Sequence, residues 1–468
     1  MRLRPLALAL SIVLLPAAAH AEDLLQTYQL ARTSDPQLAA AEAGQRATAE
    51  GEAQTRAQML PQVNGGANIT RQRQTSESGQ PQYDPVTGQI ISGGERTTDS
   101  TSRSANIGVD QVLFNAGLFS QHRAQKLNTR AGELQLESTG DQLITRTSQA
   151  YFNVLVALET LSAAEAQEAA LKKQFDFASK RLEVGMAPIT DQHEARAQYE
   201  GARANTILQR NALEDAYQAL AEITGQPVKS LMALPDDFKP QLPAEGGADA
   251  WVARAIANNP ALTAQHTRVE AAEEGISTAR AGYLPTLSAS GSYGISRTNS
   301  SVDIASGQGF DSDGRGRGPS ITLALRVPIF DGFATQSRVR QAVAQRDIAE
   351  QQLEQQKRGL ERSTRNAYQS LSAGISAVEA RRLALVAAQS AYEASQVGLE
   401  VGTRTVIDVL LNQQSLFNAQ QAYSQAKYNY LQSRLLLEQA AGTLDISDVQ
   451  DINRLLTVPA GQTPRIRR

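Results

Sequence analysis

The chain has 468 residues, contains no cysteine and carries a formal net charge of −3 at pH 7. The lack of cysteine excludes disulfides, thiol catalysis, cysteine-based metal sites and the lipid anchor of a lipoprotein. The slightly acidic balance gives no reason to expect a nucleic-acid partner. A chain of this length usually holds several domains, so the order of its elements has to show how it is divided.

The first 21 residues have the pattern of a secretory signal peptide, with two arginines, an apolar run over 6–15 and the small-residue site Ala19-His20-Ala21. The apolar run is far shorter than the roughly 20 residues of a membrane-spanning helix, which disfavours a membrane anchor. We expect the mature chain to begin at Glu22 with a charge of −5, because Arg2 and Arg4 leave with the peptide. No later stretch is typical of a membrane-spanning helix, which excludes a helical inner-membrane protein.

Short sequences recur in the second part of the chain and indicate an internal repeat. LEVGMAPITD at 182–191 is followed 217 residues later by LEVGTRTVID at 399–408, and Asp35-Pro36 is matched by Asn259-Pro260 at an offset of 224. The offset falls from 224 to 217 between these matches, so the first copy contains a longer insertion. After the signal peptide at 1–21 we therefore expect a first repeat at 22–226, a proline-rich connector at 227–247, a second repeat at 248–442 and a polar tail at 443–468.

Apolar residues spaced three and four apart predict long coiled-coil helices in both repeats. They are Tyr151, Val154, Leu158 and Leu161, their counterparts Tyr368, Leu371, Ile375 and Val378, and the later set Leu213, Ala216, Leu220 and Ile223. No proline interrupts 117–186 or 332–444. Each repeat can thus hold one helix of about 68 residues, or roughly 100 Å at 1.5 Å per residue. A rod of that length cannot bury its apolar seam alone.

Four segments alternate in the manner of strands with one apolar face, namely 63–72, 104–114, 286–295 and 320–330. The polar stretches 75–103 and 298–318 join them in pairs and are expected to be long loops, while the other ends run directly into the helices. Strands of about ten residues with one apolar face are typical of an outer-membrane β-barrel, with a soluble β-sandwich as the alternative.

A set of four strands cannot close a barrel, and an open edge in lipid would leave backbone groups without hydrogen-bond partners. The chain is therefore expected to form an oligomer. Two copies would supply eight strands and three would supply twelve, and the strand count alone does not choose between them.

These features resemble the TolC family of outer-membrane efflux and secretion channels. The resemblance covers residues 23–445 and rests on the duplicated halves, the LPQ and YLPT strand entries, the two LEVG turns and the closing AKYNYLQSRLLLEQAAGTL. It implies a mainly helical homotrimer, with a coiled-coil α-helical barrel in the periplasm continuous with a twelve-stranded transmembrane β-barrel in outer-membrane lipid. It also implies docking, through a periplasmic adaptor, to an inner-membrane pump or an ABC exporter for multidrug efflux or type I secretion.

The two LEVG turns are expected to be the tips of helical hairpins. Gly185 and Gly402 permit the left-handed backbone that ends a helix and reverses the chain. The resemblance adds that these glycines, with Val184 and Val401, form the surface that an adaptor grips.

Asp408 has two interpretations. With Thr405 three residues earlier it can form a capping box at a helix start. The resemblance instead implies a ring of three carboxylates at the narrowest point of the channel, which would attract cations. The family has a second acidic residue three positions later, where this chain has Leu411, so the cation preference should be weaker than the full pattern implies.

Arg404 could be a solvated cation near a helix end. The resemblance implies that it links to Thr190 and Asp191 of a neighbouring tip and holds the periplasmic entrance shut. Leu399 replaces a family tyrosine that makes a companion link, which predicts easier opening. An exposed link contributes roughly 0 to 1 kcal/mol, so helix packing must also hold the closed state.

No catalytic constellation is evident, because His122, His193 and His266 are isolated and none lies in a two-histidine metal spacing. We expect no enzyme activity, no cofactor and no bound metal. Trp251, the only tryptophan, is expected to be a packing anchor at the start of the second repeat. The rival to a transport channel is a structural coiled-coil scaffold of the periplasm without an open lumen.

Overall fold

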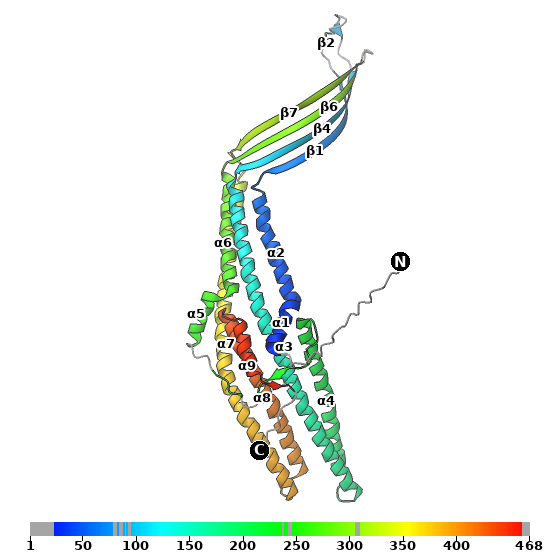
Figure 1. The fold of residues 1–468 in the computed structure, drawn as a ribbon, viewed down its shortest axis with the longest axis vertical. Helices are drawn as coiled ribbons and strands as arrows, with labels where there is room; N and C mark the ends of the chain where they lie inside the picture. Colours follow the sequence, from blue (N-terminus) through cyan, green and yellow to red (C-terminus); the bar gives the residue numbers. More distant parts are fainter. Residues whose placement is uncertain are drawn as a thin grey trace, which may run out of the picture. The chain divides into compact units, whose positions relative to one another are not determined.

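Figure 1 shows the computed structural model, which describes residues 23–77, 82–83, 88, 90–91, 95–235, 238–241, 246–304 and 309–460. The predicted signal peptide lies outside these residues. The chain forms two compact units: unit 1 combines Met1–Gly44, Glu133–Thr263 and Glu354–Arg468, and unit 2 combines Gln45–Gly132 and Ala264–Leu353. Each unit draws on both predicted repeats. The repeat boundaries concern sequence similarity rather than contacts, and they stay a prediction.

The helices are α1 (Leu24–Ser34), α2 (Pro36–Ala57), α3 (Ala116–Glu183), α4 (Ile189–Thr224), α5 (Ala248–Asn258), α6 (Pro260–Arg280), α7 (Ala334–Glu400), α8 (Val406–Ala441) and α9 (Ile446–Leu455). The α3 helix has 68 residues and α7 has 67, which confirms the two long helices expected from the proline-free stretches. Among the described residues, no helix has both the length and the apolar character needed to cross a membrane.

The matching short sequences form matching helix ends. Asp35 Oδ1 accepts a hydrogen bond from Leu38 N at 2.7 Å at the start of α2, and Asn259 Oδ1 accepts one from Leu262 N at 3.0 Å at the start of α6. The α4 helix ends at Gly225 with φ 72°, and α8 ends at Gly442 with φ 68°. The repeated residues are thus those that begin and end helices, because caps satisfy the backbone groups that a helix leaves unpaired.

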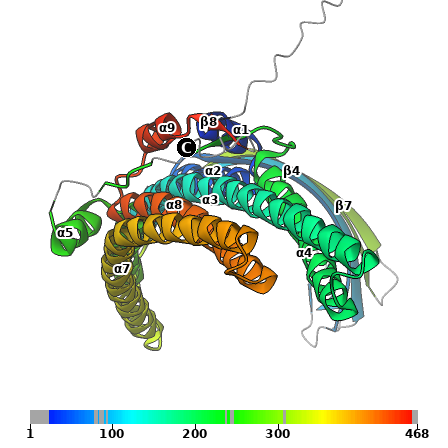
Figure 2. The same cartoon turned by 90° about the horizontal axis from the view of Figure 1, so that it is seen from below.

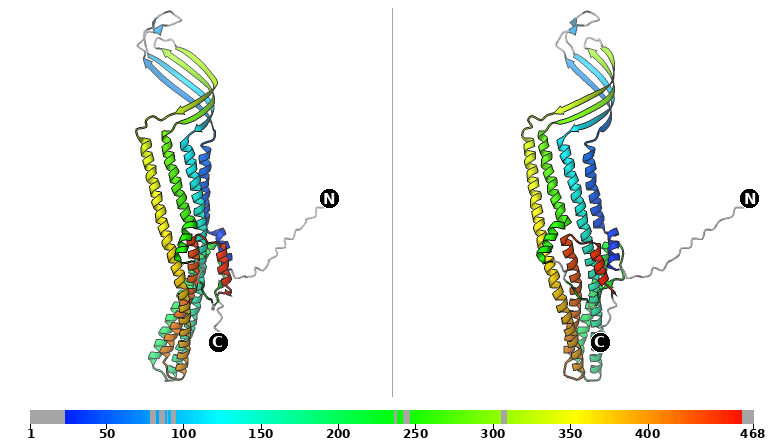
Figure 3. Two further views of the ribbon diagram at one scale, coloured as in Figure 1. Left: turned by 90° about the vertical axis from the view of Figure 1, so that its left-hand side faces the viewer. Right: turned by 60° about the vertical axis from the view of Figure 1, so that its left-hand side comes forward.

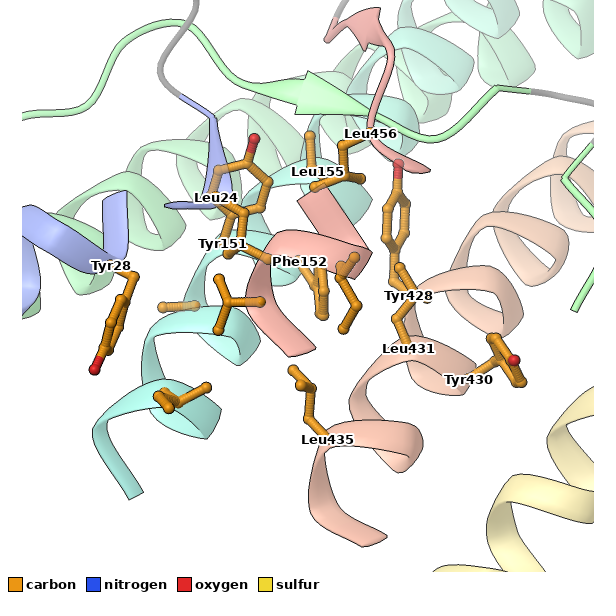
Figure 4. Close-up of a cluster of buried hydrophobic side chains, with 14 of the residues drawn as sticks. Leu24, Tyr28, Tyr151, Phe152, Leu155, Tyr428, Tyr430, Leu431, Leu435 and Leu456 are labelled. Atoms are coloured by element: carbon orange, nitrogen blue, oxygen red, sulfur yellow. The ribbon is translucent and has the colours of Figure 1, made fainter. Parts of the chain in front are cut away.

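The apolar core of unit 1 lies where α3 and α8 meet the short helices α1 and α9 (Figure 4). Tyr151, Val154, Leu220 and Leu371, all from the predicted seams, are fully buried. Phe152 of α3 stacks on Tyr428 of α8 with ring centroids 5.7 Å apart. Full burial of such side chains stabilises a fold by about 1.5–3 kcal/mol each. The coiled-coil spacing therefore identified residues of the real core.

Polar contacts also join α3 to α8, in addition to the pairing of α3 with α4 and of α7 with α8 (Figure 2). Glu159 of α3 accepts hydrogen bonds from the hydroxyls of Ser424 and Tyr428 on α8, the latter at 3.1 Å. The amino group of Lys427, whose side chain is 2% exposed, lies 3.9 Å from Glu159. These contacts connect a helix of the first predicted repeat to a helix of the second.

The connector and the tail contain small elements that the sequence pattern does not predict. β5 (Met232–Ala233), in the connector, pairs with β8 (Val458–Pro459), in the tail, and α9 buries Val449 and Ile452. The tail is therefore a packed part of unit 1 up to residue 460, rather than simply polar. Trp251 is 2% exposed in the core, which confirms its expected role as a packing anchor.

Unit 2 contains an antiparallel sheet in the order β1 (Gln62–Glu77), β4 (Glu95–Phe114), β6 (Thr286–Ile304) and β7 (Gly309–Arg326). A separate pair, β2 (Gln82–Tyr83) and β3 (Ile90–Ile91), lies between β1 and β4 in the sequence. The parts of α2, α3, α6 and α7 that belong to unit 2 lie side by side in the same order as the strands they adjoin (Figure 3). Arg123 of α3 forms an ion pair at 2.9 Å with Glu274 of α6 in this layer.

The four strands are confirmed, but their predicted lengths were wrong. They have 16, 20, 19 and 18 residues, and much of the stretches 75–103 and 298–318 that were expected to be loops continues the strands. The pairing persists to Glu77 opposite Glu95, because ladder hydrogen bonds join backbone groups and do not require apolar side chains. The last strand ends at Arg326 instead of 330, since Pro328 has no N–H to donate.

Candidate functional site

The turn between α3 and α4 ends α3 with a Schellman motif. Met186 N donates to Arg181 O at 2.7 Å, and Gly185 N donates to Leu182 O at 2.9 Å. Gly185 has φ 74° and has open space where a Cβ would project. The left-handed backbone expected at Gly185 is confirmed, and the glycine serves the turn rather than a close contact.

The turn between α7 and α8 repeats this geometry. Thr403 N donates to Gly398 O at 2.8 Å, Gly402 N donates to Leu399 O at 3.2 Å, and Gly402 has φ 78°. The following helices start differently, because Thr405 caps α8 with its side chain whereas Pro188 gives α4 no side-chain cap. The two LEVG sequences therefore encode the same end of a helix and different starts of the next.

Apolar side chains are exposed at both turns. Val184 is 66% exposed and Val401 is 67% exposed, at equivalent positions of the two turns, and Met186 is similarly open. Clustered exposed apolar side chains on a polar helical surface are typical of a site for a protein partner. Val184, Gly185, Val401 and Gly402 thus lie where a partner that contacts the hairpin tips would meet them.

Arg404 packs its side chain over the last turn of α7. A Cβ built on Gly398 would lie 2.6 Å from Arg404 Cγ, so the glycine makes room for the arginine. No hydrogen bond or ion pair joins Arg404 to Thr190 or Asp191 within the described part of one chain. Thr190 Oγ1 instead lies 3.5 Å from Asp191 Oδ1 on its own helix, and all three residues are exposed.

Asp408 forms the expected capping box. Its Oδ2 accepts hydrogen bonds from Thr405 N and Thr405 Oγ1, both at 2.9 Å, and its own N donates to Thr405 Oγ1 at 3.2 Å. The bonds from the Thr405 backbone and side chain, helped by the charge of Arg404, hold the pKa of Asp408 below its ordinary value. The carboxylate is therefore ionised at neutral pH. Leu411, one turn later, is 65% exposed and supplies no second charge.

Gly398 and Met186 help to shape the turns but are not among the residues predicted from the sequence. A signal was present, because the residue before LEVG is Arg181 in the first copy and Gly398 in the second. Because Gly398 has no side chain, the second turn has room for the side chain of Arg404.

The two faces of the sheet differ in chemistry. Val63, Val109 and Ile321 lie in one row across the strands and belong to the face with the apolar alternation. The next row belongs to the opposite face and consists of Asn64, Gly108, Ser292 and Ser320, with the two serine hydroxyls 2.8 Å apart. One apolar face and one polar face are what a sheet needs to separate lipid from a water-filled lumen.

The histidines and acidic residues form no cluster in the described residues that could hold a metal ion. His122 Nδ1 lies 3.1 Å from Thr55 Oγ1, and His266 lies 3.3 Å from Glu270 on the same helix. The first contact joins α3 to α2, and the second joins side chains one turn apart on α6.

A profile of the outer membrane efflux protein family matches residues 27–226 and 251–443. The chain is also 33% identical to the outer membrane protein TolC of Escherichia coli K12 over 473 residues, which covers 99% of this chain and 91% of that protein. The chain belongs to the TolC family of outer membrane efflux proteins. TolC of Vibrio cholerae is 32% identical and covers 98% of the chain.

Solved structures of outer-membrane channels share the fold. The CmeC channel of Campylobacter jejuni has a TM-score of 0.73 at 18% identity, covering 93% of this chain and 90% of that chain. The MtrE channel of Neisseria gonorrhoeae, solved in its open state, has a TM-score of 0.69 at 20% identity, covering 90% and 91%.

Membership of the TolC family makes this chain an outer membrane efflux or secretion channel that extends into the periplasm. It is a transport protein and not an enzyme, and the rival interpretation as a scaffold without a lumen is set aside. Channels of this family are trimeric and work with pump partners.

Proposed function

We propose that three copies of this chain assemble into a passive conduit whose periplasmic entrance is formed by the six hairpin turns. The observation that supports this proposal is the pair of open edges, since β1 and β7 each have a described strand on one side only. In a membrane, open edges need partners, because lipid offers no hydrogen bonds to backbone groups. Pairing β7 of one copy with β1 of the next closes a ring of twelve strands.

The mass of the particle extracted in mild detergent tests the assembly. The expected result is three chains per particle, with no folded monomer detectable in membranes. A particle with the mass of one chain would contradict the proposal.

The hairpin tips are proposed to bind a periplasmic adaptor, which connects the channel to an inner-membrane pump or ABC exporter. Val184 and Val401 support this because they are exposed at equivalent places, beside glycines that offer open space. Burying two such valines contributes on the order of 2 kcal/mol each, and six tips in a trimer multiply the contacts.

Substituting Val184→Asp together with Val401→Asp should abolish capture of the adaptor by the channel in a pull-down, with trimer yield unchanged. Ile207→Asp is the matched control, since Ile207 is 58% exposed on α4 but lies outside the turns. Equal loss of adaptor in the control would contradict docking at the tips.

The entrance is proposed to be held shut by Arg404 of one subunit bonded to Thr190 and Asp191 of a neighbouring tip. Their exposure, and the lack of a bond from Arg404 to either residue within the described part of one chain, support this because all three remain available to a neighbour. Each bond contributes roughly 0 to 1 kcal/mol. With Leu399 in place of a companion tyrosine, few links of this kind close the entrance.

Arg404→Ser should raise the single-channel conductance in planar bilayers without changing trimer yield. Arg196→Ser, which removes an exposed charge from α4 near the tip, is the control and should leave conductance unchanged. An unaltered conductance in a correctly assembled Arg404→Ser channel would refute the link.

The cargo is proposed to be set by the pump. Among the relatives are the alkaline protease secretion protein AprF of Pseudomonas aeruginosa, 27% identical, and the pyoverdine export protein OpmQ of Pseudomonas putida, 25% identical. The same conduit thus fits small-molecule efflux and type I secretion. Drug sensitivity and the secreted proteins of a deletion strain, measured together, distinguish the two.

A further inference from the structure

The apolar face of the sheet ends in arginines. Six of them lie on this face in the part of the strands that is farther along the sheet from the helices, and we name them the distal arginine cluster: Arg71, Arg73, Arg103, Arg297, Arg315 and Arg317. Arg103, Arg297 and Arg315 occupy one row on three neighbouring strands, opposite Ile69 of the fourth. Like charges directly opposite each other destabilise a sheet unless anions compensate them.

The opposite face has no charge at this level. Its three interleaved rows consist only of Asn, Gln, Ser, Thr and Gly: Asn68, Ser104, Ser296 and Gly316, then Thr70, Ser102, Thr298 and Gly314, then Gln72, Ser100, Ser300 and Ser312. A water-filled lumen would solvate arginines at little cost, yet all of them project from the face that carries the apolar band. The charges therefore belong to the membrane side of the sheet.

Internal ion pairs neutralise only part of the cluster. Arg73 forms a forked pair with Asp99 at 2.7 Å, and Asp313 pairs with Arg297 at 2.9 Å and with Arg315 at 3.8 Å. The same rows contain six arginines against three aspartates, the third being Asp311. Among the described residues, Arg71, Arg103 and Arg317 have no acidic partner within ion-pair distance. Asp303, Glu77 and Glu95 lie on the same face in the next two rows, so the surplus of positive charge is confined to the four rows of the cluster, where an external anion can match it.

The height of the cluster matches a membrane interface. Leu287, at the helix end of β6, and Arg297 are ten residues apart on the same face. At 3.3 Å per residue and a tilt near 45° this places the arginine about 23 Å above the leucine. The apolar band of a bacterial outer-membrane barrel is about 25 Å tall. Because the helices lie in the periplasm, the cluster lies at the headgroup level of the outer leaflet.

We propose that the distal arginine cluster binds the phosphate groups of a phosphorylated glycolipid in the outer leaflet of the outer membrane. A guanidinium presents two parallel N–H donors to a phosphate, and this charge-assisted contact is stronger than a neutral hydrogen bond. Arg103 and Arg317, which are both exposed and have no acidic partner in the described chain, are the principal contacts. The site concerns the surrounding lipid and does not depend on the proposed gate or adaptor surface.

Lipid binding to the purified, fully assembled channel tests the proposal. The probe is lipid A carrying both of its phosphates, titrated into detergent-solubilised channel and counted by native mass spectrometry. Dephosphorylated lipid A and phosphatidylethanolamine are the lipid comparisons, and inorganic phosphate tests for a simple anion site. We expect bisphosphorylated lipid A to bind, dephosphorylated lipid A to bind at least about tenfold more weakly, and inorganic phosphate at millimolar concentration not to displace it.

The double variant Arg103→Gln with Arg317→Gln should weaken binding of bisphosphorylated lipid A by about tenfold per arginine. Arg96→Gln with Arg326→Gln is the matched control, because it removes the same charge from the opposite face of the same sheet. Arg103→Lys, which keeps the charge but loses the fork, should retain part of the affinity.

Three results would overturn the proposal: equal binding of dephosphorylated lipid A, displacement by inorganic phosphate alone, or equal loss in the control and the double variant. A trimer that forms but binds the lipid undiminished after loss of Arg103 and Arg317 would overturn it as well. Trimer yield on gels separates a binding defect from failure to assemble.

Discussion

Among the glycines that end helices, Gly442 is the one at which an added side chain should lower the stability of the fold most. It has φ 68°, and an added Cβ would lie 2.6 Å from Asn258 O and 2.8 Å from Asn259 Cα. The left-handed backbone costs an alanine about 1–2 kcal/mol. The contact is with backbone, which cannot rotate away as a side chain can, and overpacking of this kind adds about 1–3 kcal/mol. Gly442→Ala should therefore destabilise unit 1 by about 2–5 kcal/mol.

Two glycines with the same backbone separate these contributions. Gly402 has φ 78° and open space at its Cβ, so Gly402→Ala should show only the backbone cost of about 1–2 kcal/mol. Gly225 has φ 72°, and its Cβ would meet the Ser34 side chain at 2.9 Å, so Gly225→Ala should fall between them. The common backbone conformation makes the three variants a graded series.

The assay is urea unfolding of the detergent-solubilised channel, followed by helical circular dichroism at fixed protein concentration. The expected order of midpoints is Gly402→Ala highest, Gly225→Ala next and Gly442→Ala lowest. If Gly442→Ala unfolds no earlier than Gly402→Ala, the argument from backbone contact at Asn258 and Asn259 is wrong.

Burial, reinforced by the charge of Glu137, raises the pKa of Asp141 to about 7. Its contribution to stability is therefore fully present below about pH 4 and is lost as the pH rises through about 7. Asp141→Asn should flatten the dependence of the urea midpoint on pH between about pH 4 and pH 7, by on the order of 1 kcal/mol after allowing for solvent screening. An unchanged pH profile would contradict this. Glu159→Gln leaves Lys427 buried without a counter-charge and should lower the free energy of unfolding in urea by about 3 kcal/mol. Lys427→Met should lower it much less, and equal losses of stability in the two variants would refute the pairing. Asp408→Asn should lower the cation-to-anion permeability ratio, measured from reversal potentials in a salt gradient, with a loss of at most about 1 kcal/mol of helix stability. Unchanged reversal potentials would mean that Asp408 serves only as a helix cap.

The sequence by itself determined the local structure that depends on nearby residues. The two LEVG turns, the capping box at Thr405 and Asp408 and the two long helices all follow from short-range rules, since helix ends are set by residues within one or two turns. The apolar alternation located four strands, because side chains on a strand point to opposite faces in turn. Those same features carried the resemblance to the TolC family.

Only the tertiary structure decided where distant residues meet. The strands continue beyond the apolar alternation, because backbone pairing with a neighbouring strand, and not side-chain pattern, maintains them. The ion pair of Glu159 with Lys427 brings together residues that are 268 positions apart in the sequence. The alignment of Arg103, Arg297 and Arg315 depends on the register of three strands. Register and helix pairing are long-range properties, and a sequence period specifies the face of an element but not which element lies against it.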